Sequence, residues 1–143
     1  MPIAIGGSSV ATLRMLPDTV VLANYIGEVR DVAAYQITIM NHVYCPEVEG
    51  SAVSTPGRRK NDSAQLYFFD KRSIATDENG NKRTYLPYEL WKALEDKTPY
   101  WTLCDGGRDT FRKQGSGKEL YVTGFAHYVV GTARMWHFEV FGS

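Results

Sequence analysis

Alternation of side chains along the chain is the feature that most constrains the fold. In "AAYQITIMNHVYC" (residues 33–45), Tyr35, Ile37 and Ile39 occupy every second position, and Gln, Thr and Met fill the positions between them. A strand turns successive side chains to opposite faces, whereas a helix repeats every 3.6 residues. The segment therefore predicts a β-strand that ends before Pro46.

Further short apolar segments follow, and turn residues separate them. The strongest turn signal is Asn79-Gly80, because both residue types tolerate positive φ. One segment alone has helical spacing, about residues 87–96, where Pro87 suits the first turn. These patterns predict a mainly β fold, a small β-barrel or sandwich with one short α-helix and long loops.

The length of 143 residues allows one domain with a hydrophobic core of its own. Residues 1–17 contain Gly-Gly-Ser-Ser and lack periodicity, so we predict an extended N-terminal arm that becomes ordered only against a neighbour. Residues 18–143 form the predicted single β-rich domain. Period-two spacing predicts a core that includes Ile37, Ile39, Leu66, Phe68, Val122, Trp136, Phe138 and Val140.

Charge and hydropathy exclude some classes of protein. Sixteen basic residues balance sixteen acidic ones, which argues against a dedicated nucleic-acid binder but permits a local basic surface. The N-terminus lacks the features of a signal peptide, and no apolar run approaches the ~18 residues of a membrane span. We expect a protein made in the cytoplasm that has no membrane partner.

The residues typical of catalytic and metal sites do not form a recognisable signature. His42, Cys45 and Cys104 lack the paired spacing of a zinc site. The two cysteines are interpreted as free thiols in a reducing compartment, with one disulfide as the alternative. His127 and His137 lie on adjacent predicted strands, where they could face each other as packing residues. We predict no enzyme, no cofactor and no metal.

A basic cluster, Arg58, Arg59 and Lys60, interrupts the loop over residues 47–63. Such a cluster in a loop rich in Gly, Ser and Pro is often only solvated. The other interpretation is contact with phosphate, which guanidinium and ammonium groups bind well.

Two stretches carry a resemblance to a known family: "RTYLPYELWKALEDKTPYWTLCDGGRDTF" (residues 83–111) and "TGFAHYVVGTARMWHFEV" (residues 123–140). With the earlier "YQITIMNHVY" and "LYFFD" strands, they resemble small minor-capsid or head–tail connector proteins of tailed bacteriophages. The likeness is to the stopper-like head-completion proteins of siphophages of Gram-positive hosts. It covers residues 20–143 and leaves the N-terminal arm outside.

The resemblance implies a structural virion protein of the phage neck, assembled in the host cytoplasm. It implies a homo-oligomeric ring, of twelve or six copies, between portal or adaptor and tail, where it extends or closes the DNA channel. Arg58, Arg59 and Lys60 would then contact packaged DNA without reading its sequence. The alternative is a stand-alone β-barrel binding module that recognises a peptide or small ligand.

Overall fold

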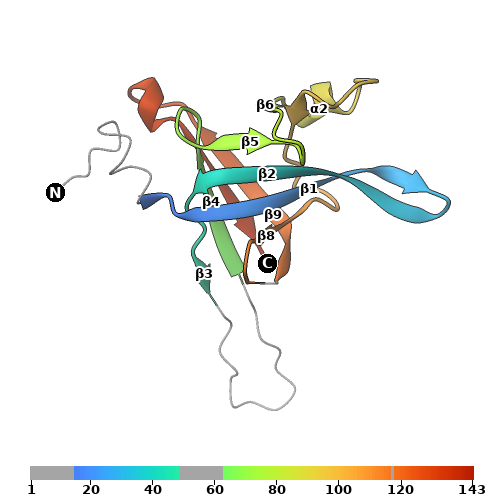
Figure 1. The fold of residues 1–143 in the computed structure, drawn as a ribbon, viewed down its shortest axis with the longest axis horizontal. Helices are drawn as coiled ribbons and strands as arrows, with labels where there is room; N and C mark the ends of the chain where they lie inside the picture. Colours follow the sequence, from blue (N-terminus) through green and yellow to red (C-terminus); the bar gives the residue numbers. More distant parts are fainter. Residues whose placement is uncertain (1–14, 49–62, 117) are drawn as a thin grey trace, which may run out of the picture.

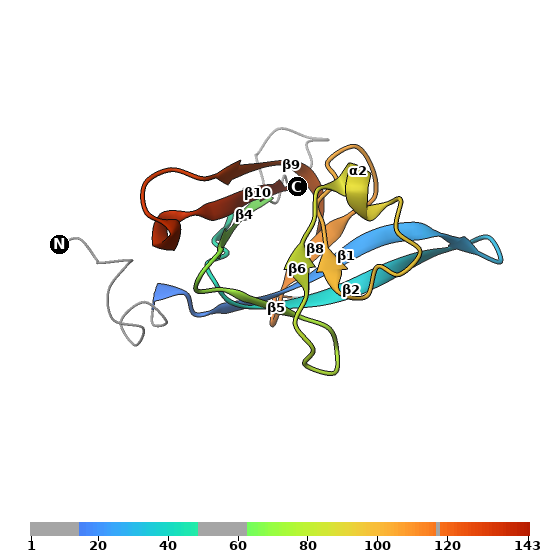
Figure 2. The ribbon, with the colours of Figure 1, turned by 90° about the horizontal axis from the view of Figure 1, so that it is seen from above.

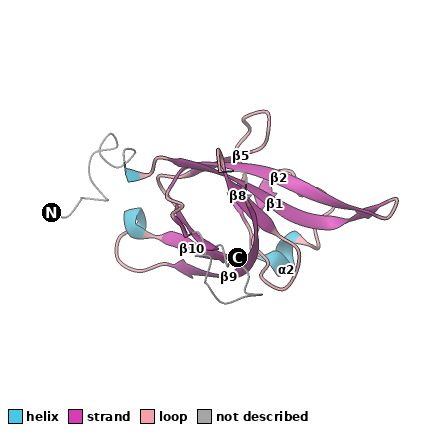
Figure 3. Ribbon diagram, turned by 90° about the horizontal axis from the view of Figure 1, so that it is seen from below, coloured by secondary structure: helices cyan, strands magenta, loops and turns pink. Residues whose placement is uncertain are grey.

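A computed structural model describes residues 15–48, 63–116 and 118–143, and most of them lie in one curled antiparallel sheet (Figure 1). Along the sheet the strand order is β3-β4-β10-β9-β8-β1-β2-β5. The strands are β1 (Asp18–Val29), β2 (Val32–Val43), β3 (Glu47–Val48), β4 (Ser63–Phe69), β5 (Ile74–Thr76), β8 (Thr110–Lys113), β9 (Glu119–Tyr128) and β10 (His137–Gly142). The predicted mainly β fold is confirmed, in the form of an eight-stranded half-barrel (Figure 3).

The curl of the sheet brings its two margins together. Tyr44 follows β2, and Tyr67 lies in β4. Their backbones exchange two hydrogen bonds, Tyr44 N–H to Tyr67 O at 3.2 Å and Tyr67 N–H to Tyr44 O at 2.8 Å. Strands from opposite sides of the sheet thus share the bonds that an open edge would leave unpaired.

Gly142 permits the close approach of β10 to the ring of Phe111 in β8. A Cβ at Gly142 in β10 would lie 2.5 Å from the ring of Phe111 in β8, well inside contact distance. The register of β10 against β9 also shifts between Phe141 and Gly142. Only a residue without a side chain lets these strands approach so closely.

The predicted helix is much shorter than expected. Instead of residues 87–96, α2 spans Tyr88–Trp91, between β6 (Thr84–Tyr85) and β7 (Tyr100–Trp101), which pair in parallel. Trp91 is buried, but Leu90 is 59% exposed. Short helices depend on packing, and this apolar stripe has too little buried surface to hold further turns.

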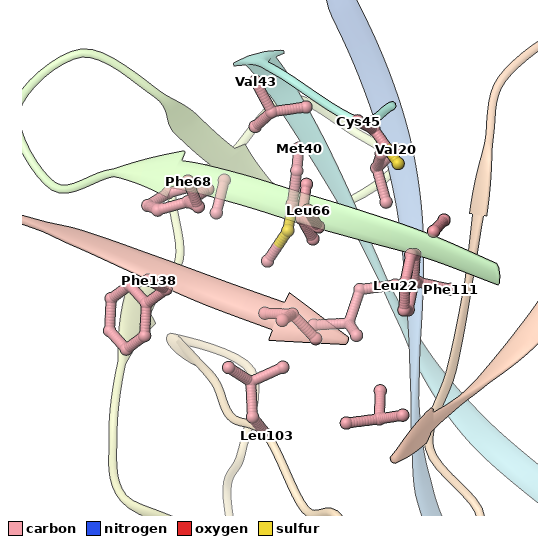
Figure 4. Packing of buried hydrophobic residues seen from close by; sticks show 14 of the residues in the cluster. Val20, Leu22, Met40, Val43, Cys45, Leu66, Phe68, Leu103, Phe111 and Phe138 are labelled. Carbon is pink, nitrogen blue, oxygen red and sulfur yellow. The ribbon is translucent and has the colours of Figure 1, made fainter. Parts of the chain in front are cut away.

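Sixteen buried residues form the core inside the half-barrel (Figure 4). Five of the predicted core residues are buried as expected, Leu66, Phe68, Val122, Phe138 and Val140. The segment that contains Trp101 and Leu103 packs against them and covers one side of the core.

The other three predicted core residues were placed wrongly. In β2, Thr38 and Met40 are buried, whereas Ile37 and Ile39 on the opposite face are only partly buried. Both faces of this strand carry large apolar residues, so alternation alone did not show which face points inward. Trp136 is also half-buried, because it ends the 3-10 helix η1 (Ala133–Met135) before β10 begins.

Of the predicted N-terminal arm, residues 1–14 lie outside the described residues. Leu16, within the predicted arm, is buried at 6% exposure. Leu16 therefore packs against the described fold, and the boundary at residue 18 stays a prediction.

Replacing Phe138 with Ala should lower the free energy of unfolding by about 3–5 kcal/mol, because a fully buried ring would leave a cavity. Trp136→Ala is the control, and it should cost clearly less because its side chain is half-buried. Chemical denaturation measures both variants. An equal or larger loss for Trp136→Ala would contradict the placement of these two residues.

Candidate functional site

The predicted DNA-contacting residues, Arg58, Arg59 and Lys60, lie outside the described residues. The strands on either side of residues 49–62 are described, and they pair with each other, Val48 opposite Ser63. The two described residues that flank this segment, Val48 and Ser63, therefore lie together at the same margin of the sheet.

The most distinctive described feature is a long hairpin that extends beyond the half-barrel (Figures 1 and 2). In β1 only Val20–Ala23 pair with β8, and in β2 only Ile39–Asn41 pair with β5. Residues 25–35, here called the hairpin arm, pair within the hairpin but with no other strand of the described sheet.

The turn at the end of the hairpin arm is compact. Arg30 and Asp31 both have positive φ, 53° and 66°. This is the two-residue geometry that matches the natural twist of paired strands. The arm continues the pairing of β1 with β2 as far as this turn, with one register shift between Tyr25 and Gly27.

Apolar side chains are exposed along the hairpin arm. Val29 and Val32, next to the turn, are 63% and 66% exposed, and Ile26 is 49% exposed. Tyr35 is 38% exposed and contacts Tyr25 edge to face, with ring centroids 5.7 Å apart. Clustered apolar side chains on a projecting element are typical of a surface that contacts another molecule.

A buried carboxylate fixes the base of the hairpin arm. Asp109 Oδ1 accepts the backbone N–H of Tyr25 at 2.9 Å, and Oδ2 accepts the backbone N–H of Cys104 at 3.0 Å. Oδ2 also accepts a hydrogen bond from Asn24 Nδ2 at 2.8 Å. Asn24 Nδ2 donates to Thr102 O as well, at 2.8 Å, so the segment 102–109 is tied to β1.

Burial raises the pKa of the Asp109 carboxyl, and the hydrogen bonds from Tyr25, Asn24 and Cys104 partly oppose this rise. The folded state therefore binds the proton more tightly than an unfolded aspartate does. The stability that this difference supplies is present at low pH and declines as pH rises through the folded pKa.

Arg108 adds a second, exposed contact at the base of the arm. Its guanidinium lies 4.6 Å from the ring centroid of Tyr25, and Nη1 donates to the Tyr25 hydroxyl at 2.9 Å. The same nitrogen is 3.4 Å from Glu28 Oε2. Exposed ion pairs are worth only ~0–1 kcal/mol, so Arg108 orients the arm more than it stabilises it.

The two C-terminal histidines do not face each other, although they lie on adjacent strands as predicted. His127 is opposite Phe138, and His137 is opposite Tyr128, so a one-residue offset puts the histidines on opposite faces. His127 stacks on Phe138 and contacts Asp70 Oδ2 at 2.8 Å. His137 pairs with Glu139 at 3.0 Å.

One hollow in the described surface combines cations with aromatic rings. It has a volume of about 470 Å³, and we call it the basic hollow. Lys71, Arg72, Lys82 and Arg83 contribute its charge, and Phe68, Tyr85, Trp101 and Phe138 contribute its rings. A second hollow of about 340 Å³ shares Lys71 and Arg72 and adds Arg134.

Sequence reasoning missed the basic hollow because its cations come from separate segments. "DKR" follows β4 and "NKR" follows a turn, and each alone has the composition of a solvated loop. The available signal was the pair of Lys-Arg dipeptides, which the structure places on either side of the short strand β5.

The cysteines and His42 do not form a metal site. Within the described ranges, no group of three His, Cys, Asp or Glu side chains could hold a metal ion. Cys45 and Cys104 are free thiols. Cys45 is fully buried, and this burial raises the pKa of its thiol to about 12. No helix among the residues described is long and apolar enough to cross a membrane.

Comparison with known proteins found no match to a protein-family model, to a curated protein or to a solved structure.

Replacing Asp109 with Asn should destabilise the protein by about 1–3 kcal/mol. One carboxylate oxygen becomes an amide nitrogen, which donates hydrogen bonds, so the backbone N–H that faced that oxygen loses its acceptor. Denaturant titration measures the loss. Asp105→Asn is the matched control, since Asp105 is exposed, and it should change stability little. Equal effects of the two substitutions would contradict the role of Asp109.

The two thiols should differ in reactivity in the native protein. Cys104 is half-exposed and should react with a thiol reagent at neutral pH, whereas Cys45 should react only after denaturation. Counting labelled thiols by mass spectrometry tests this. Rapid labelling of native Cys45 would show that its strand is not packed as described.

Proposed function

We propose that this chain is a structural subunit of the neck of a tailed bacteriophage. In this proposal it forms a ring between the portal or adaptor and the tail, and it extends or closes the DNA channel. The observation that carries the proposal is the hairpin arm, which is braced at its base and exposes apolar side chains beyond the half-barrel.

The physical argument concerns symmetry. A ring of identical subunits needs two different surfaces on each copy, one of which binds the other on the next copy. An element that projects from its own domain can supply one such surface. The hairpin arm has the required exposed valines, and its two-residue turn places Val29 and Val32 opposite each other.

The sequence resemblance to head–tail connector proteins supports the same function. It implies partners of three kinds: other copies of the chain, the portal or adaptor and tail proteins, and packaged DNA. It also implies a location in the virion neck and a role without catalysis.

A stand-alone binding module remains the second candidate. The basic hollow favours it, because ligand sites are commonly concave and combine an apolar lining with a few polar groups. A module of this kind would bind its ligand as a monomer, whereas the neck subunit must associate with itself or with a portal.

Replacing Val29 and Val32 together with Ser should abolish self-association while preserving the fold, because both side chains are exposed in the monomer. Light scattering after size-exclusion chromatography, over a range of protein concentrations, measures the oligomer. The native chain should form a larger, ring-shaped species, visible by negative-stain electron microscopy.

The matched control replaces Val129 and Val130 with Ser. These residues are also exposed, at 52% and 70%, and they lie between β9 and η1. Assembly should survive this change. The proposal fails if the native chain stays monomeric both alone and with a portal ring, or if the control disrupts assembly as strongly as the arm variant does.

A further inference from the structure

Cations from three separate segments meet at one end of the half-barrel. Lys71 and Arg72 follow β4, Lys82 and Arg83 precede β6, and Arg134 lies in η1. The two hollows share Lys71 and Arg72, so the five side chains belong to one continuous surface. In a chain with no net charge, this is a local concentration of positive charge.

Among the described residues, the carboxylates of Asp70, Asp77 and Glu78 lie near this surface. Asp70 is the one acidic residue that lines the basic hollow, and its Oδ2 is already 2.8 Å from His127. Asp77 and Glu78 also act on Arg83 from the neighbouring turn. Asp77, however, accepts hydrogen bonds from the backbone and side chain of Asn81, so its carboxylate is held within that turn.

Arg83 is held in place without a carboxylate partner among its hydrogen bonds. Its Nη1 donates to Ile37 O at 2.7 Å and to Thr38 Oγ1 at 3.2 Å, and its Nε donates to Thr98 O at 3.0 Å. Neutral acceptors supply these hydrogen bonds of the guanidinium, and Asp77 and Glu78 act on it through charge alone. A fixed cation beside the exposed Lys71 and Lys82 is suited to attract an anion.

We propose that this surface binds the phosphate backbone of a nucleic acid, without reading its sequence. A single carboxylate would use only part of the surface, since the cations extend over two adjoining hollows. A chain of phosphates offers repeated negative charges at regular spacing, and it can engage the exposed Lys71 and Lys82 together. Phe68, Trp101 and Phe138 beneath are almost fully buried, so these three rings offer no face on which bases could stack, and the proposed contact is with phosphates.

Lys71 and Arg72 of the basic hollow follow the far end of β4 from Ser63, which is the first described residue after the segment that contains Arg58, Arg59 and Lys60. A strand of this length spans roughly 20 Å. The proposed binding at the basic hollow uses described residues alone, and it requires no ring.

The experiment measures binding of the full chain to a fluorescein-labelled, random-sequence duplex DNA by anisotropy, over a series of salt concentrations starting at low salt. Lys71→Gln combined with Lys82→Gln should weaken binding about tenfold or more at low salt. It should also reduce the salt slope by about 2, because each lysine removed neutralises one phosphate fewer. Both side chains are exposed, so the fold should be preserved.

The matched control is Lys92→Gln combined with Arg112→Gln, which makes the same change in net charge at exposed positions outside both hollows. It should bind DNA nearly as the native chain does.

Absence of DNA binding at low salt, or equal weakening in the control, would overturn the proposal. Polyglutamate that binds as tightly as DNA, with the same weakening on Lys71→Gln/Lys82→Gln, would instead assign the surface to an acidic protein. Because DNA binding and ring assembly are measured separately, either proposal can fail while the other stands.

Discussion

The hydrogen bonds of one buried carboxylate, Asp109, connect the half-barrel to its projecting arm. Asp109 holds the backbone of Tyr25 and Cys104 and the side chain of Asn24, at the level where β1 ends its pairing with β8. Burying a carboxylate is costly unless donors surround it, and here both oxygens have donors. Without these hydrogen bonds, the arm would leave the sheet with its base unsupported on that side. The exposed apolar residues of the arm then could not be presented in one orientation.

The described surface therefore offers two different means of contact. The hairpin arm presents apolar side chains next to a compact turn, and the basic hollow presents cations at one end of the half-barrel. Apolar contact suits association with protein, because its strength comes from removing surface from water. Clustered exposed cations suit a phosphate chain, because their attraction is long-ranged and sensitive to salt. A ring protein beside DNA needs both kinds of surface, and this need links the two proposals.

The parts of this structure that depend on local pattern could be predicted from the sequence. Strands β4 and β10 have clear alternation, so Leu66, Phe68, Phe138 and Val140 were placed correctly. In β2 the alternation predicted the strand correctly but predicted the wrong buried face. Ile37 and Ile39 lie on one face and Met40 on the other, so the apolar residues alone did not show which face is buried. The contacts of Asp109 with Tyr25 and Asn24 join residues more than eighty positions apart, and the basic hollow combines turns on both sides of β5. No local pattern encodes such contacts, since they exist only after the sheet has curled.

Hydrogen exchange of individual backbone amides, followed by NMR in the monomer and by mass spectrometry in the assembly, tests the central claim most directly. The claim is that Asp109 braces an arm that is free in the monomer and covered by a neighbour. The Tyr25 and Cys104 amides should exchange as slowly as the core strands, although their acceptor is a side chain. Residues 26–34 should exchange faster in the monomer and become protected on assembly. Fast exchange at Tyr25 and Cys104, or an arm whose protection does not change on assembly, would contradict this account.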